Sequence, residues 1–227
     1  MVGKQVAVVV GVGPGLGNAL VRRFAEAGMN VAAVSRKGSA PAPEPHGDLV
    51  RGYACDATMG DQVTAMMAQV AAAFGPPDLV VFNVGTWDRA NILDISDELF
   101  ERAWCTGCFG GFLVGRAAAG AMLPRGRGTL IFTGATGSIR GGAGFAAFAV
   151  PKFGLRALAQ SMARELGPKG LHVAHVLIDG MIDPQGGNGS DGVLAPAAIA
   201  EAYYQLHRQE RSAWTHELDL RPAAEKF

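Results

Sequence analysis

Residues 5–28 have the sequence QVAVVVGVGPGLGNALVRRFAEAG, and the fold class follows from this stretch. Residues 5–10 form a mostly apolar run without polar alternation, which is typical of a parallel strand covered on both faces. Four glycines follow the run, and residues 16–27 then carry apolar side chains at helical spacing until Gly28. The stretch therefore predicts a strand, a tight turn and a helix, which together begin a β-α-β unit.

The alternation of strands and helices continues to the end of the chain. Ser96 and the acidic residues after it mark the start of the longest helix, because a serine N-cap and an acidic first turn stabilise that end. A helix between two parallel strands makes a right-handed crossover in nearly all proteins. We therefore predict one doubly wound α/β domain of the Rossmann type over residues 1–227. Its remaining strands are expected at residues 30–34, 49–54, 79–82, 128–132, 171–178 and 214–220, and its remaining helices at 61–74, 96–122, 145–166 and 197–208.

The composition argues against several classes of protein. Of the 227 residues, 49% are apolar and 18% are charged, so the chain can bury a core and is not expected to be disordered. Twenty basic and twenty acidic residues cancel, which argues against a nucleic-acid-binding surface. No apolar run has the length of a membrane span, and the N-terminus lacks the layout of a signal peptide. Three cysteines do not form a disulfide framework, so we expect a cytoplasmic protein with reduced thiols.

The glycine-rich turn at residues 11–17 predicts a dinucleotide site. In a doubly wound fold, the carboxyl end of the first strand borders the crevice where ligands bind. Glycine lets the backbone turn tightly and lets a diphosphate approach the N–H groups at the start of a helix. The alternative is a tight turn that binds no ligand, but the position between a strand and a helix favours the nucleotide. The residues of this predicted site are Gly11, Gly13, Gly15, Leu16 and Gly17.

The residues after the second strand predict which nicotinamide cofactor is bound. An acidic side chain there would bind the ribose hydroxyls of NAD, whereas an arginine accommodates the 2′-phosphate of NADP. The chain has Ser35, Arg36 and Lys37 at this place and no carboxylate. Arg36 can donate two hydrogen bonds to phosphate oxygens, so NADP(H) is favoured. The alternative is that Arg36 is a loop cation that contacts only water.

With these features, the chain resembles the short-chain dehydrogenase/reductase family from about residue 3 to residue 184. The resemblance implies that Asp56 contacts the adenine and that Lys152 holds the nicotinamide ribose. It also implies a cofactor role for Asn83 and Gly85, which keep the second asparagine and the glycine of the family's Asn-Asn-Ala-Gly segment. Gly180 keeps the glycine of the family's Pro-Gly segment after the sixth strand.

Three positions depart from the catalytic pattern of that family. Phe148 lies four positions before Lys152, where the family has a tyrosine, and spacing to the same lysine places Ala135 at the family's serine. Gly107 falls at the family's asparagine. The ring of Phe148 can neither donate nor accept a proton, so proton transfer would need another group.

Two interpretations of this altered site remain open. In one, the protein is an oxidoreductase that acts on a small carbonyl or activated-alkene compound with a relocated proton donor. The candidates are Thr136, next to Ala135, and Asp179, which replaces the proline of the Pro-Gly segment and is expected to face the nicotinamide pocket. Each has a structural alternative, because threonine and aspartate commonly stabilise turns and bind nearby backbone. In the other interpretation, the chain binds the dinucleotide without turnover and acts as a regulatory or interaction protein.

Several further features give predictions of their own. A C-x-x-C pair at residues 105–108 could pair or bind metal, but burial as packing thiols is favoured and no metal site is predicted. Trp87 and Arg89 are expected at the border of the substrate cleft, and Arg140, after the Ala135 loop, is expected to attract an anionic substrate. The resemblance also implies a homo-oligomer, a dimer or a tetramer, that pairs through the helix at residues 145–166 and the long helix before it.

Overall fold

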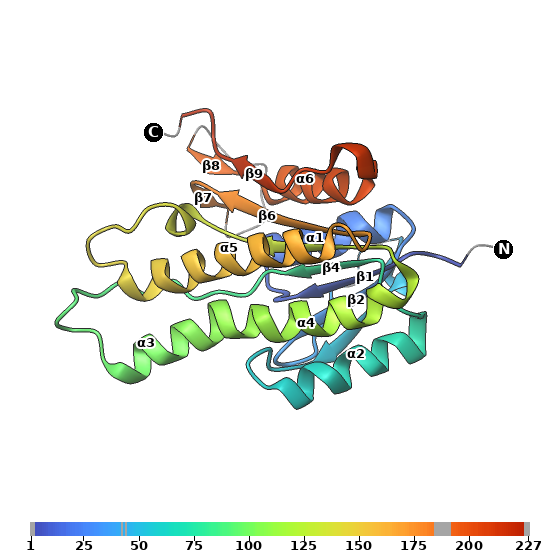
Figure 1. Ribbon diagram of the computed structural model, residues 1–227, viewed down its shortest axis with the longest axis horizontal. Coiled ribbons are helices and arrows are strands. Elements are labelled where there is room, and N and C mark those ends of the chain that lie inside the picture. The colour runs from blue at the N-terminus through green and yellow to red at the C-terminus, as the bar shows by residue number, and fades with distance from the viewer. Residues whose placement is uncertain (1–2, 42, 44, 184–191, 225–227) are drawn as a thin grey trace.

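Seven parallel strands form the central sheet of the structure, a computed structural model that describes residues 3–41, 43, 45–183 and 192–224 (Figure 1). The strand order is β3-β2-β1-β4-β5-β6-β9, so the chain adds strands on one side of β1 up to β3 and on the other side from β4 onward. Two short strands, β7 and β8, pair with each other in a separate parallel ladder. The strands are β1 (Val6–Val10), β2 (Asn30–Ser35), β3 (Val50–Ala54), β4 (Leu79–Phe82), β5 (Gly128–Thr133), β6 (Leu171–Ile178), β7 (Met181–Ile182), β8 (Val193–Leu194) and β9 (Glu217–Leu220).

Helices cover both faces of this sheet (Figure 1). Side chains of α2, α4 and α5 pack on one face, and side chains of α1 and α6 pack on the other. This is the doubly wound Rossmann-type architecture that the alternating pattern predicts. The helices are α1 (Leu16–Glu26), α2 (Gly60–Phe74), α3 (Asp97–Trp104), α4 (Gly110–Met122), α5 (Ala146–Leu166) and α6 (Pro196–Arg208).

Strand β1 shows why the strand sequences lack polar alternation. Val6, Val8 and Val10 pack on the side of α2, α4 and α5, while Ala7 and Val9 pack on the side of α1 and α6. Because both faces of the sheet are covered, every residue of the strand is buried whichever way its side chain points. Burial of each valine stabilises the fold by about 1.5–3 kcal/mol.

The predicted elements are confirmed, with small shifts at their ends. The largest shift is in the last strand, which begins at Glu217 instead of at residue 214. Trp214 stays outside the sheet because its ring stacks on His172, with centroids 4.9 Å apart and the two planes nearly parallel. The short β7–β8 ladder has no periodic signal in the sequence and was not predicted.

The long helix starts where its cap predicts but does not continue as one α-helix. The hydroxyl of Ser96 accepts a hydrogen bond from the N–H of Leu99, which confirms the N-cap. A π-helical turn at Cys105–Phe109 then separates α3 from α4. Within this turn, a Cβ on Gly107 would lie 3.0 Å from Pro151 of α5, so glycine allows the two helices to approach closely here.

The helical run Asp97–Arg125 is long and apolar enough, by length and composition, to cross a membrane. The expectation that no stretch of the chain meets this criterion is therefore wrong. Half of its most apolar window, 50%, is buried inside the domain, and side chains of α4 belong to the hydrophobic core. This burial is what a helix packed against a sheet requires.

Candidate functional site

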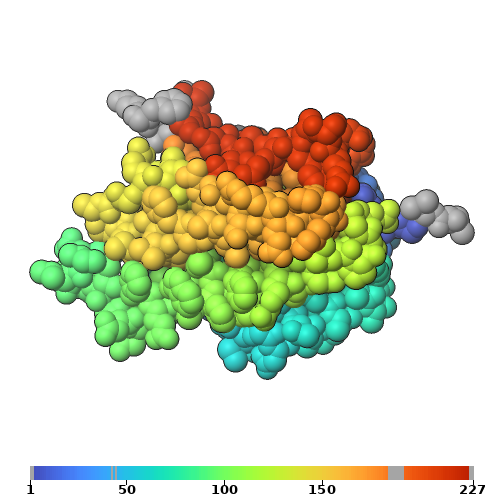
Figure 2. Space-filling model, in the orientation of Figure 1, coloured from blue at the N-terminus to red at the C-terminus, as the bar shows by residue number. Residues whose placement is uncertain are grey.

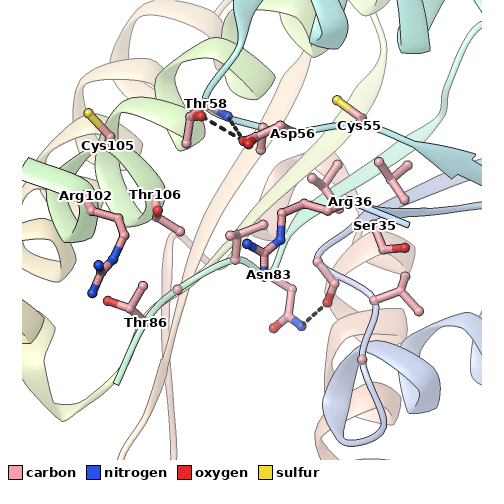
Figure 3. A pocket seen from close by; sticks show the side chains of 18 residues that line it. Ser35, Arg36, Cys55, Asp56, Thr58, Asn83, Thr86, Arg102, Cys105 and Thr106 are labelled. Carbon is pink, nitrogen blue, oxygen red and sulfur yellow. Dashed lines mark hydrogen bonds between the residues drawn. The ribbon is translucent and has the colours of Figure 1, made fainter. Parts of the chain in front are cut away.

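The strand order places a crevice at the carboxyl ends of β1 and β4. These two neighbours lie where the chain changes the side on which it adds strands, and ligands of open α/β sheets bind at such a point. A cavity of about 640 Å³ lies there, with side chains from several strand ends directed into it (Figure 3). We call it the nucleotide cavity. The predicted cofactor residues that line it are Gly11, Gly13, Ser35, Arg36, Asp56, Asn83 and Gly85.

The glycines of the turn after β1 have different roles. Gly11 has a φ of +99°, and a Cβ on it would lie 2.5 Å from the carbonyl oxygen of Asn83. A Cβ on Gly17 would lie 2.6 Å from the carbonyl oxygen of Gly11, so the chain's own packing requires both glycines. At Gly13, no described atom lies within 4 Å of the Cβ position. The missing side chain at Gly13 leaves the backbone uncovered toward the cavity, as close approach of a diphosphate requires.

Helix α1 begins at this turn with a free positive end. Its N-cap, Gly15, has no side chain to accept from the first N–H groups, and its first turn has no acidic residue. A helix start without a side-chain cap or an acidic first turn keeps the partial positive charge of the helix dipole, which favours an anion. Gly15 lines a separate shallow groove along α1, whereas Leu16 and Gly17 are buried beneath the turn and can contact a ligand only through their backbone.

The ends of β2 and β3 form the part of the nucleotide cavity where the sequence predicts that adenosine binds. Within the described residues, the guanidinium of Arg36 forms no ion pair, and it lies at the cavity near the Asp56 carboxylate (Figure 3). The hydroxyl oxygen of Ser35 is buried without a hydrogen-bond partner among the described residues. Asp56 accepts from the N–H of Thr58 at 2.9 Å and from its hydroxyl at 2.7 Å. These two hydrogen bonds lower the pKa of Asp56, and the nearby charge of Arg36 lowers it further.

Asn83 supports the glycine turn. Its side-chain amide donates to the carbonyl oxygen of Gly11 at 3.1 Å, and its own N–H donates to the carbonyl oxygen of Val10 at 2.8 Å. The end of β4 is thereby joined to the turn after β1. Asn83 lines the cavity and also fixes the shape of its floor.

Lys152 lies in a second cavity, of about 320 Å³, that we call the lysine cavity. The side chain is only 7% exposed, and its ammonium donates to the carbonyl oxygen of Thr133 at 2.9 Å. Burial lowers the pKa of Lys152 to about 8. A Cβ on Gly85 would lie 3.2 Å from Nζ of Lys152, so glycine leaves room for the ammonium. Gly180 lines the same cavity, which brings three predicted cofactor residues together.

A third cavity, of about 360 Å³, adjoins the lysine cavity, and we call it the aromatic cavity. Phe148 lines both cavities and is 8% exposed, and its ring lies edge-on to Trp87 with centroids 4.8 Å apart. A Cβ on Gly137 would lie 2.7 Å from the Phe148 ring, so this ring packs directly on the loop after β5. Trp87 and Arg140 line the aromatic cavity, whereas Arg89 packs over the ring of Phe145 and is not among the lining residues.

The two predicted proton donors contact each other. The hydroxyl of Thr136 donates to Oδ1 of Asp179 at 2.5 Å, and Oδ2 of Asp179 lies 3.6 Å from the guanidinium of Arg221. Asp179 is 5% exposed and is not among the residues that line the lysine or the aromatic cavity. The expectation that Asp179 faces the nicotinamide pocket is therefore wrong, because these two partners hold its carboxylate beneath the cavity wall. Of the two residues, only Thr136 lines the aromatic cavity.

The two cysteines of the C-x-x-C pair lie in different environments. Cys105 lines the nucleotide cavity, whereas the sulfur of Cys108 packs beside Gly154 of α5 and burial raises its pKa. All three cysteines of the chain are free. Among the residues that the structure describes, no cluster of three metal-ligating side chains occurs.

Sequence reasoning missed several residues of the site. Thr58 could have been found, because Asp-x-Thr after a strand is typical of a turn closed by the aspartate side chain. Phe145 and Met181 line the aromatic cavity, but no local pattern marks them. Thr86 and Thr106 line the nucleotide cavity, and no local pattern marks them either, because only the fold brings them there.

Comparisons with known proteins agree with this architecture. The sequence model of a family described as short chain dehydrogenase matches residues 5–186. A short-chain dehydrogenase from Rhodopseudomonas palustris is 41% identical, with a TM-score of 0.83 over 96% of this chain and 98% of that chain. A metagenomic short-chain oxidoreductase crystallised with NADP is 26% identical, with a TM-score of 0.82 over 97% and 98% of the two chains. A Melia azedarach protein, (21S)-21-acetoxyl-apo-melianone synthase SDR, is 30% identical over 87% of this chain and 74% of its own length.

Proposed function

Because the chain belongs to the short chain dehydrogenase family, we propose that it binds NADP(H) and catalyses hydride transfer with a small carbonyl or activated-alkene compound. The observation that carries this proposal is the coincidence of three features around two cavities that share Gly85. They are an uncovered glycine turn at a helix start, an arginine that forms no ion pair within the described residues, and a buried lysine. We also propose that the protein works in the cytoplasm.

The residues of the nucleotide cavity fit the cofactor. The open Cβ position of Gly13 and the uncapped start of α1 suit a diphosphate, and the unpartnered hydroxyl of Ser35 with the guanidinium of Arg36 suits a 2′-phosphate. Asp56 is held ionised at the adenine end, and Lys152 would donate to the nicotinamide ribose. When bound, NADP(H) supplies or accepts the hydride.

The proton is assigned to the pair of Thr136 and Asp179. Phe148 and Ala135 offer no hydroxyl at the positions where the family has tyrosine and serine. During oxidation of an alcohol, the substrate O–H would give its proton to Oγ1 of Thr136 while the Thr136 proton moves to Asp179. Reduction of a carbonyl runs the same two transfers backward. A positioned acid or base of this kind contributes roughly 10²–10⁴-fold in rate.

A second candidate function is dinucleotide binding without turnover. It is favoured by the same observation that makes the site atypical, the phenyl ring of Phe148 as a wall of both substrate-side cavities. The two candidates differ in one measurement, the consumption of NADPH with a panel of carbonyl and activated-alkene compounds. Consumption with any compound of the panel supports the oxidoreductase, and none with any compound supports the binding protein.

The cofactor proposal is tested by titrating NADPH and NADH into the protein. We expect NADPH to bind about 10- to 150-fold more tightly, because a charged hydrogen-bonding group contributes about 1.5–3 kcal/mol. Arg36→Asp should abolish this preference, whereas Lys37→Asp is the matched control, since Lys37 does not line the nucleotide cavity. Equal affinities that Arg36→Asp leaves unchanged would refute the NADP(H) assignment, and no binding of either nucleotide would refute the whole proposal.

We further propose that the protein is a homo-oligomer, a dimer or a tetramer. Helices α4 and α5 lie side by side on the face drawn in Figure 2. Their outer surface includes the exposed side chains of Phe112, Val150 and Phe153. Sedimentation equilibrium tests this proposal, with Phe153→Glu expected to shift the mass toward the monomer and a monomeric wild-type protein counting against it.

A further inference from the structure

The walls of the aromatic cavity indicate what kind of molecule it accepts, provided that the proposed function holds. Trp87, Phe145 and Phe148 form an edge-to-face cluster with centroids 4.8, 5.4 and 6.4 Å apart. Two apolar side chains of this region remain open to solvent, since Trp87 is 66% exposed and Met181 is 62% exposed. Large exposed apolar surfaces beside a cavity commonly mark a binding site for an apolar group.

The shape of the cluster favours a flat ring system over a bulky aliphatic group. Aromatic rings prefer edge-to-face or offset contacts, and the Trp87–Phe148 and Trp87–Phe145 pairs both have interplanar angles of 62°. A planar ligand can lie against one of these faces without displacing either ring. Phe148 itself is fixed by its contact with Gly137, so it serves as a rigid wall.

The charged side chain among the described residues that line this cavity is basic. Arg140 lines it, and within the described residues its guanidinium has neither an ion pair nor a hydrogen bond. Helix α5 begins beside the cavity at its N-cap, Phe145, and its first turn contains no acidic residue. Arg89 adds a second cation, at 5.3 Å from the centroid of the Phe145 ring. No aspartate or glutamate is among the described lining residues, and the Asp179 carboxylate beneath the wall lies 3.6 Å from the guanidinium of Arg221, so the free cations at the surface of the cavity favour an anion.

We propose that the substrate is a planar aromatic or conjugated compound that carries a carboxylate or a similar anionic group. Its ring lies against Trp87 and Phe148, its anion is bound by Arg140, and its reactive group points past Ala135 toward the lysine cavity. Ala135 lines both cavities, which makes this path continuous. The residues that select the substrate are then Trp87 and Arg140.

The test measures binding, not turnover, by calorimetry on the protein saturated with NADPH. The probes are 2-naphthoate, the neutral 2-acetonaphthone of similar shape, and cyclohexanecarboxylate as an anion without an aromatic ring. We expect 2-naphthoate to bind more tightly than either other probe. Arg140→Gln should weaken 2-naphthoate about fivefold, the upper range for an ion pair at an exposed arginine, and leave 2-acetonaphthone unchanged.

Controls separate this inference from the cofactor proposal. Arg140→Lys should restore most of the affinity for 2-naphthoate, and Arg127→Gln should have no effect, since Arg127 lies at the opposite end of β5. Trp87→Ala should weaken both naphthyl probes to a similar degree. Normal NADPH binding with equal affinity for all three probes, or an Arg140→Gln variant that binds 2-naphthoate like the wild type, would overturn the inference. A wild-type protein that does not bind NADPH would instead refute the proposed function.

Discussion

Two alanine substitutions four residues apart, Gly13→Ala and Gly17→Ala, separate the fold from the cofactor site. At Gly17, the new Cβ would lie 2.6 Å from one backbone oxygen and 2.7 Å from a backbone Cα, neither of which can move cheaply. Forcing such overlap into a packed region costs about 1–3 kcal/mol of the free energy of unfolding. At Gly13, no described atom lies within 4 Å of the added Cβ, so the free energy of unfolding should stay within about 0.5 kcal/mol of the wild type.

Gly13→Ala, the variant that keeps its stability, is the one expected to lose affinity for NADPH. The Cβ at Gly13 would stand where a diphosphate approaches the turn, and losing one hydrogen bond to a charged oxygen costs about 1.5–3 kcal/mol. The Kd for NADPH should therefore rise roughly 10- to 150-fold in Gly13→Ala, although the protein unfolds like the wild type. Urea denaturation gives the stability, and the fluorescence of bound NADPH gives the affinity. Gly28→Ala is a suitable control, because its φ of +80° makes it destabilising although it lies at the far end of α1.

The result that would refute this reasoning is a Gly13→Ala variant with wild-type affinity for NADPH. The diphosphate would then not lie over that part of the turn. A Gly13→Ala variant that is destabilised as much as Gly17→Ala would equally contradict the geometry.

Three further predictions concern the substrate side and Lys152. Restoring hydroxyls with Phe148→Tyr and Ala135→Ser should raise carbonyl reduction about 10²-fold in a spectrophotometric assay of NADPH, and unchanged rates would mean that the pocket no longer orients a carbonyl. Thr136→Val and Asp179→Asn should each lower kcat at least tenfold without altering the Kd for NADPH, while Thr136→Ser retains activity. If all three variants had the same kcat as the wild type, the pair would have no part in the mechanism. The folded-state pKa of Lys152, about 8, lies below its value of 10.5 in the unfolded chain, so the unfolded chain binds more protons between these pH values. The free energy of unfolding of the wild type minus that of Lys152→Met should therefore increase from pH 8 to pH 10.5, and a difference that falls or stays flat in urea titrations would contradict the buried ammonium.

Much of the site could be predicted because its signals are local. The turn at residues 11–17, the cation at Arg36 and the spacing from Ala135 and Phe148 to Lys152 can each be found within a short window of sequence. The structure brings all of them to the carboxyl ends of the parallel strands, as a doubly wound sheet requires.

Contacts across long separations could not be predicted in the same way. Thr136 and Asp179 were separate candidates in the sequence, and only the pairing of β5 with β6 brings them within hydrogen-bonding distance. The same holds for the edge-on contact of Trp87 with Phe148, whose loop and helix meet beside the sheet. The π-helical turn at Cys105–Phe109 lies where α5 approaches closely, and the spacing of apolar residues along a helix does not predict such an approach.

The chain itself therefore determines the parallel sheet and the glycine turn, since apolar runs, helical periods and glycine positions act through the backbone within a few residues. Tertiary structure alone determines which way the carboxylate of Asp179 points, which side chains line the aromatic cavity, and which arginine there has no ion pair within the part of the chain that the structure describes. These properties depend on side chains that are distant in sequence and meet only after the strands have taken their order, so no local pattern can encode them.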